Sequence, residues 1–137
     1  MKYINSLDEA LAIITREECL QPCVITDPNR PNNPVVYVTR EFERQTGYAR
    51  EDVLGCNCRL MQDPDTNVSE AARIQYSLDR MVPIEVELLN YRKDGSPFWN
   101  QLSIRPDFSE VGKLGSFVAS MFIRPIEARQ SVLVAAE

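Results

Sequence analysis

A chain of 137 residues is close to the common size of one domain and is long enough to bury a hydrophobic core. Its 15 basic and 20 acidic side chains give a net charge of −5, which argues against a nucleic-acid surface, because phosphate binding needs clustered Lys and Arg. No apolar run approaches the roughly 20 residues that span a bilayer, and residues 1–5 lack the apolar centre of a signal peptide. We therefore expect a cytoplasmic protein that binds neither nucleic acid nor membrane.

The chain contains no histidine and four cysteines, at positions 19, 23, 56 and 58. Without histidine there is no His-ligated haem and no catalytic pairing of histidine with serine or cysteine. The cysteine spacings are C-x3-C and C-x-C, and the second is a poor match to the spacing of zinc ligands. A structural zinc module is therefore the weakest interpretation, and we expect free thiols and no metal.

The predicted elements begin with a helix near the N-terminus, where Ser6 and Glu9 have the spacing of a capping box. Apolar residues recur at helical spacing along it, at Leu7, Leu11 and Ile14. Two β-branched runs at residues 23–26 and 35–39 then predict strands, joined by a turn rich in Pro and Asn.

Short helical segments follow between residues 40 and 60, and Asn67 with Glu70 indicates the capped start of a longer helix that runs to Met81. The last third predicts strands at residues 84–90, 98–104 and 114–123. Strands, then short helices, then a meander of strands indicate the α+β class with an antiparallel sheet.

Two asparagines fall on the core face of the predicted hairpin near the C-terminus. Side chains alternate along a strand, so Asn90 and Asn100 share the apolar face of their strands. With a three-residue loop at residues 94–96, the two would lie directly opposite each other, with Cβ atoms about 5 Å apart. Buried amides need hydrogen-bond partners. The pair therefore either forms hydrogen bonds with the polar edge of a flat heterocyclic ligand or bonds to nearby backbone groups.

A second candidate site lies at residues 55–62, where polar groups surround a thiol on what looks like a single helical turn. A buried cysteine is usually a small apolar filler. Here Cys58 is flanked by Asn57, Arg59 and Gln62, a set suited to a polyhydroxylated, phosphorylated ligand, because the guanidinium fork matches phosphate.

This segment resembles the signature G-x-N-C-R-F-L-Q of the light-oxygen-voltage (LOV) photoreceptor family. It departs from the signature at Leu60 and Met61, which are apolar replacements for Phe and Leu. Further similar segments occur in the same order, at residues 46–48, 53–55, 63–66, 90–95 and 98–100. The resemblance extends from Cys23 to Ile123, which is most of the chain.

The resemblance implies a PAS fold, with a five-stranded antiparallel sheet and short helices on one face that together enclose FMN. The implied parts are an N-terminal cap helix at 1–20, a flavin-binding core at 21–125 and a short extension at 126–137. Cys58 corresponds to the cysteine that bonds reversibly to flavin C4a after blue light is absorbed. The other ligand positions are Asn57 and Gln62 for the ribityl chain, Arg59 for the phosphate, Asn90 and Asn100 for the pyrimidine edge, and Leu60, Leu102 and Phe117 for packing on the ring.

Two positions depart from the family pattern. Gln75 stands where many members carry a second phosphate-binding arginine, and Arg73 lies on a different part of the predicted helix. The binding site would then accept riboflavin or FAD more readily as alternatives to FMN. Met121 falls where the family has a glutamine beside the flavin ring, so a glutamine flip is not the signalling step of this chain.

The resemblance favours a light-sensing binding module over an enzyme. A flavin-based redox sensor that uses the same pocket is the alternative, with Cys19, Cys23 and Cys56 as the residues that would distinguish it. Output would pass through self-association or through an effector that the sequence does not identify.

The sheet face opposite the pocket carries an apolar stripe, formed by Leu89, Trp99, Val118 and Phe122. Such a stripe needs a cover. We weigh three covers: the N-terminal helix, the C-terminal residues Val132 and Leu133, and a second copy of the chain. We favour the homodimer.

Overall fold

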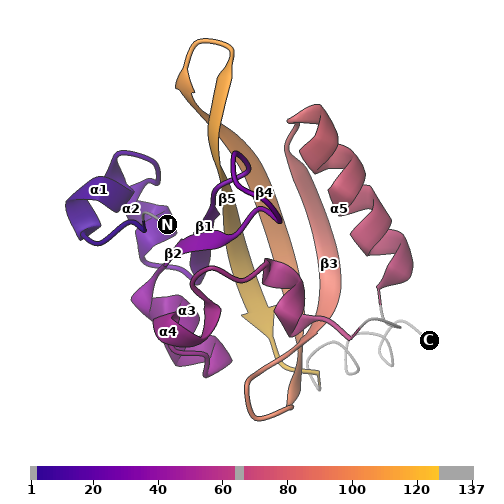
Figure 1. Cartoon of the computed structure of the whole chain (residues 1–137). Coiled ribbons are helices and arrows are strands. Elements are labelled where there is room, and N and C mark those ends of the chain that lie inside the picture. The colour runs from indigo at the N-terminus through magenta and orange to yellow at the C-terminus, as the bar shows by residue number, and fades with distance from the viewer. Residues whose placement is uncertain (1–2, 64–66, 127–137) are drawn as a thin grey trace.

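The computed structural model describes residues 3–63 and 67–126. Its centre is a five-stranded antiparallel sheet in the order β2-β1-β5-β4-β3 (Figure 1). The strands are β1 Cys23–Thr26, β2 Val35–Val38, β3 Ile84–Tyr91, β4 Pro97–Glu110 and β5 Lys113–Arg124. The last strand pairs with the first, so the two strand-forming regions of the sequence join in one sheet. The predicted α+β class with an antiparallel sheet is confirmed.

Helices cover both faces of this sheet. On the inner face, residues of four helices and of all five strands form one large apolar cluster. These helices are α3 Arg40–Thr46, α4 Arg50–Val53, the 3-10 helix η1 Cys58–Met61 and α5 Val68–Arg80. On the outer face, α1 Leu7–Leu11 and α2 Arg16–Cys19 lie beside β1 and β2 (Figure 1).

The N-terminal segment forms two short helices where the sequence predicted one. Ser6 caps α1 by accepting a hydrogen bond from the Glu9 backbone N–H, as predicted. The chain then turns, and Thr15 starts α2 with a complete capping box to Glu18. Ile14 is buried, in agreement with the predicted apolar pattern, whereas Leu7 is exposed and Ala10, which the pattern did not include, is buried.

This N-terminal segment covers part of the outer face. Ala10 and Ile14 pack in a second apolar cluster with Ile25, Val36 and Val118. Val118 is fully buried there, whereas Phe122, farther along β5, is 64% exposed. Of the three covers weighed for the stripe, the N-terminal segment therefore covers its Val118 end, and Val132 and Leu133 lie outside the described residues.

Helix α5 starts where the sequence predicts, but not for the predicted reason. Asn67 has a left-handed backbone (φ 60°) and makes no side-chain cap. Its amide instead donates to the Leu89 carbonyl (2.7 Å) and accepts from the Leu89 N–H (3.0 Å). These two bonds attach the start of α5 to β3 and therefore help to fix the helix over the inner face.

The register of the β3–β4 hairpin corrects a prediction. Asn90 lies opposite Phe98, and Asn100 lies opposite Leu88, so the two asparagines are diagonal neighbours and not a directly opposed pair. The turn closes earlier than expected, because the Arg92 N–H donates to the Ser96 carbonyl (2.9 Å). The shift is an even number of residues, so both asparagines keep the predicted face.

Candidate functional site

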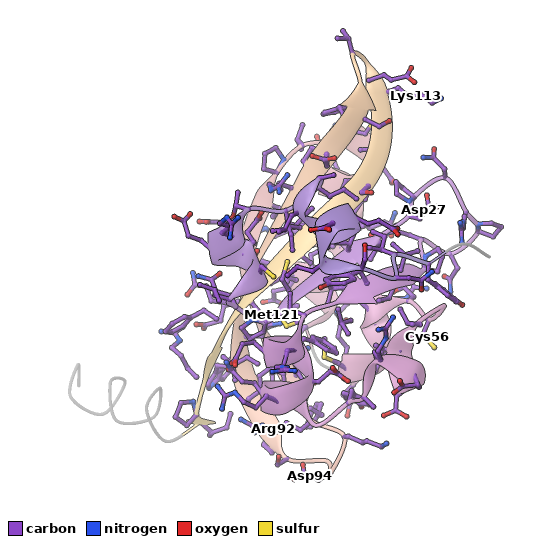
Figure 2. The ribbon with its side chains drawn as sticks, turned by 90° about the vertical axis from the view of Figure 1, so that its left-hand side faces the viewer. Asp27, Cys56, Arg92, Asp94, Lys113 and Met121 are labelled. Carbon is purple, nitrogen blue, oxygen red and sulfur yellow. The ribbon has the colours of Figure 1, made fainter. Side chains whose placement is uncertain are left out.

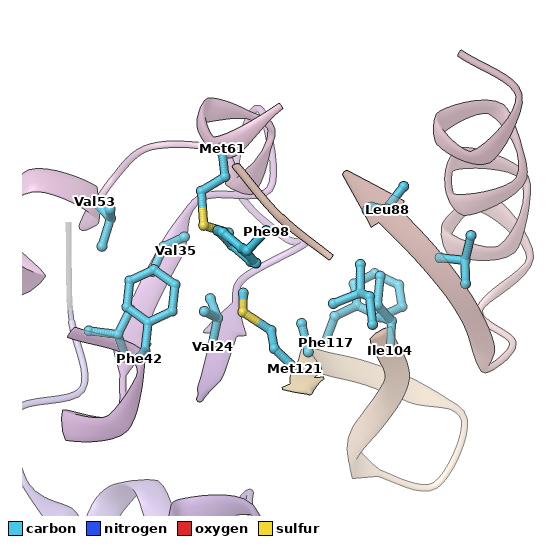
Figure 3. Packing of buried hydrophobic residues seen from close by; sticks show 14 residues of the cluster. Val24, Val35, Phe42, Val53, Met61, Leu88, Phe98, Ile104, Phe117 and Met121 are labelled. Carbon is cyan, nitrogen blue, oxygen red and sulfur yellow. The ribbon is translucent and has the colours of Figure 1, made fainter. Parts of the chain in front are cut away.

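A cavity of about 600 Å³ lies between the inner face of the sheet and the helices. This volume falls in the range of about 300–1,000 Å³ that is usual for small-ligand sites. Figure 3 shows the labelled side chains of the inner cluster converging from the strands and from η1. The apolar walls comprise Met61, Ile74, Leu78, Leu88, Leu102, Ile104, Phe117, Ala119 and Met121.

The structure brings almost all of the predicted site residues to this cavity. Lining it are Cys58, Asn57, Arg59, Gln62, Gln75, Asn90, Asn100, Leu102, Phe117 and Met121. Leu60 is the exception within the described part of the chain, because it packs half-buried against the inner cluster and does not line the cavity. Segments from opposite ends of the sequence thus supply one site.

Cys58 is the first residue of η1 and faces the cavity. Asn57 caps this short helix, and its Oδ1 accepts from the Arg59 N–H (2.9 Å). Burial raises the pKa of the Cys58 thiol to about 12, and the neighbouring Arg59 cation only partly opposes the shift. The sulfur therefore keeps its proton at neutral pH.

Asn90 and Asn100 are 2% and 1% exposed and bond to each other. Asn100 Nδ2 donates to Asn90 Oδ1 (2.9 Å), and Asn90 Nδ2 donates to the Leu89 carbonyl (3.1 Å). Asn100 Oδ1 has no partner, and neither has Thr26 Oγ1 on β1. Buried polar groups without partners are costly, so both atoms indicate a ligand with polar groups in this cavity. The Asn100 oxygen can only accept a hydrogen bond, whereas the Thr26 hydroxyl can accept or donate one.

Several polar residues of the cavity escaped the sequence prediction: Thr26, Arg30, Asn32, Asn33 and Asp79. Alternation along β1 places Thr26 on the same face as Val24, so that residue had a readable signal. The loop residues had none, because they reach the cavity only when the loop between β1 and β2 folds against η1. Asn57 Nδ2 donates to the Asn32 carbonyl (2.8 Å) and attaches that loop.

The two departures from the family pattern both lie at the cavity. Gln75 lines it, but its Nε2 donates to Asp79 Oδ1 (2.8 Å) on the next turn of α5. Arg73 is exposed and outside the lining that the described residues provide. Met121 is buried and points into the inner cluster (Figure 3), as alternation along β5 predicted.

The other cysteines do not share the cavity with Cys58. Cys56 is exposed near the edge of the molecule (Figure 2), and its thiol donates to the Asp52 carbonyl (3.7 Å). Cys23 is buried in the outer cluster, where burial raises its thiol pKa to about 12. All four cysteines are free, and residues 3–63 and 67–126 contain no group of side chains suited to hold a metal ion.

Across the same described ranges, each helix is too short or too polar to cross a membrane.

Comparison with known proteins agrees with this arrangement. The PAS domain family matches residues 21–122. A blue-light-activated histidine kinase of Brucella anthropi is 39% identical over 99 residues, which cover 72% of this chain and 20% of the kinase. Blue-light-activated histidine kinase 1 of Erythrobacter litoralis is 42% identical over 108 residues, which cover 79% of this chain and 30% of the kinase. The chain thus spans less than a third of either relative.

A solved structure described as "Flavin Analogue Sheds Light on Light-Oxygen-Voltage Domain Mechanism" superimposes with a TM-score of 0.77 at 36% identity. The match covers 96% of this chain and 94% of that one. The chain therefore belongs to the PAS domain family, and within it to the light-oxygen-voltage photoreceptor domains.

Proposed function

We propose that this chain is a blue-light receptor module that binds a flavin, FMN by preference, in the cavity and responds through a reversible bond from Cys58 to flavin C4a. The observation that carries the proposal is one cavity lined both by the Cys58 thiol and by a buried amide oxygen without a partner. The blue-light-activated relatives support it.

When bound, the flavin would supply blue-light absorption and an electrophilic ring carbon. The Asn90–Asn100 pair would orient the ring through hydrogen bonds to its polar edge. The apolar walls would exclude water. Cys58 would keep its proton on sulfur in the dark, so that the thiol can supply that proton to the ligand when its sulfur forms the bond, and can take the proton back when the bond breaks.

The redox-sensor alternative has less support. A flavin-based redox sensor that uses the other cysteines would need them beside the flavin, in the same cavity. The pKa of Cys58 is raised to about 12 by burial, and the other three cysteines do not line the cavity. We therefore propose a sensory role without turnover, with output passed to an effector protein, since the relatives named above are kinases of which the matches cover only 20% and 30%.

The visible absorption spectrum before and after blue light tests this function. We expect purified protein to be yellow, to bleach under blue light and to recover in the dark. Cys58→Ala should keep the flavin and lose the bleaching. Cys56→Ala is the matched control, because that thiol is exposed and outside the cavity, and it should bleach like the parent. Reversible formation of a thiol bond in Cys58→Ala would show that the assignment is wrong.

A further inference from the structure

Arg30, in the loop between β1 and β2, has an unusual environment for a loop arginine. Its Nε pairs with Asp27 Oδ2 at 2.9 Å, and its side chain is only 26% exposed. Its Nη1 is buried without a hydrogen-bond partner, and the residue lines the cavity. A surface ion pair would leave the rest of the guanidinium in water, where its N–H groups are satisfied. A buried guanidinium nitrogen with no acceptor instead indicates that an acceptor belongs there.

A second guanidinium, that of Arg59 on η1, is hydrogen-bonded to the same loop. Arg59 Nη2 donates to Asn32 Oδ1 at 2.8 Å, and Arg59 also lines the cavity. Among the described residues, Arg30 and Arg59 are the cations in the cavity lining. Both are held by short hydrogen bonds to loop side chains, so their positions relative to each other depend on one loop conformation.

The wall formed by α5 carries a negative charge, in contrast to the two cations on the loop side. It presents Gln75 and Asp79 to the cavity, and the Gln75 amide is engaged by the Asp79 carboxylate. Asp79 would repel an anion placed against α5, because two negative charges at close range interact unfavourably. An anionic group in this cavity is therefore favoured on the side of the β1–β2 loop.

We propose that Arg30 and Arg59 together form the phosphate site of the cavity, so that the β1–β2 loop supplies a cation to the cavity where α5 supplies none. The ligand class is a phosphomonoester, and its identity as FMN rests on the proposed function. Asp27 is a positioning residue that orients the Arg30 fork through Nε and leaves Nη1 for a phosphate oxygen. Arginine suits this position because its planar fork binds phosphate oxygens directionally.

The test compares FMN with riboflavin, which differ only in the phosphate. Dissociation constants are measured by quenching of flavin fluorescence in darkness, for the parent chain, Arg30→Gln and Arg30→Lys. We expect the parent to prefer FMN. Arg30→Gln should weaken FMN binding about tenfold to a hundredfold and leave riboflavin binding unchanged. Arg30→Lys should fall between the two, because it keeps the charge and loses the fork.

Arg73→Gln is the matched control, since it removes an arginine from the exposed part of α5 and should change neither constant. Unchanged riboflavin binding also verifies that the Arg30 variants are folded. Equal binding of FMN and riboflavin by the parent, or equal weakening of both by Arg30→Gln, would overturn the phosphate site and leave flavin binding intact. No binding of either flavin by the parent would overturn the proposed function as well.

Discussion

Asn90 and Asn100 occupy a position where folding and ligand binding make opposite demands. Each amide is almost fully buried, and together they make one mutual hydrogen bond and one bond to backbone. That leaves Asn100 Oδ1 unsatisfied in the protein alone. A pair of leucines would fill the same inner face without any polar group to desolvate. The asparagines are thus better explained by the ligand than by the fold.

Replacing both residues tests this explanation. In Asn90→Leu/Asn100→Leu we expect the ligand-free protein to be as stable as the parent or more stable, because both partners of the buried bond are removed together. The free energy of flavin binding should become less favourable by about 1–3 kcal/mol, because the polar edge of the ring loses its hydrogen-bond partners. Urea unfolding measures the first quantity and fluorescence titration the second. Full flavin affinity in the double variant would mean that the pair serves only the backbone.

At position 121 the chain has a methionine and therefore lacks the side-chain amide that the family pattern places there. Its backbone N–H donates to the Pro22 carbonyl (2.9 Å), which ties β5 to the residue before β1. Its thioether is at best a weak acceptor and cannot donate. A response that reverses the hydrogen bonding of a glutamine amide is therefore not available at this position.

At the scale of elements, one arginine holds the N-terminal helices on the outer face. Arg105 on β4 donates to both carboxylate oxygens of Glu18 (2.8 and 3.0 Å) and to the Ile13 carbonyl (2.9 Å). These bonds join the chain at α2, and just after α1, to the middle of the sheet. Ala10 and Ile14 supply the apolar part of the same contact.

We expect Arg105→Ala to loosen α1 and α2 more than the rest of the protein. The side chain is 35% exposed, so the loss in free energy of unfolding should be about 1 kcal/mol. Hydrogen exchange measures the effect, as faster exchange in residues 7–19 with β3 and β4 unchanged. Arg44→Ala is the control, because its ion pair with Glu41 lies on α3 away from this contact. Uniform acceleration over the whole chain would contradict local attachment.

The same contact should depend on pH. Burial acts to raise the pKa of Glu18, but the hydrogen bonds and charge of Arg105 and the hydrogen bonds of Thr15 outweigh it, so the pKa is lowered. A carboxyl with a lowered folded-state pKa contributes stability that is complete above its unfolded pKa of about 4.3 and is lost as the pH falls through the lowered value. The difference between the parent and Arg105→Ala should therefore become smaller in acid, where the bond to the Ile13 carbonyl remains.

Within residues 3–63 and 67–126 the fold is a sheet with an apolar cluster on each face, and the inner cluster surrounds the cavity of about 600 Å³. The N-terminal segment packs on the outer cluster and covers part of the outer face. The inner cluster leaves room for a ligand and retains polar atoms without partners. Ligand binding should therefore contribute to the stability of the fold as a whole.

We expect FMN to raise the unfolding temperature in a concentration-dependent way. At a free concentration of 100 times the dissociation constant the gain should be about 2.7 kcal/mol, by mass action. Differential scanning calorimetry in darkness measures it. Cys58→Ala should show the same gain, because the dark complex requires no bond to sulfur. A transition temperature that does not change with added FMN would show that the cavity closes or fills in some other way.

Sequence alone was sufficient wherever the relevant property is local. Alternation with a period of two placed Asn90, Asn100, Leu102, Phe117 and Met121 on one face, and a register error of two residues left that assignment unchanged. Resemblance over a continuous segment likewise located Cys58 and its neighbours.

Tertiary structure decided what depends on contacts between distant segments. Asn67 pairs with β3 and does not cap its own helix, because Leu89 offers both backbone groups at that point. Arg30 faces the cavity because Asn57 and Arg59, far along the chain, attach its loop to η1. The pattern of one segment carries no information on which other segment will meet it. The thiol, the amides and the apolar walls were thus readable in the sequence, and the second guanidinium became visible only in the folded chain.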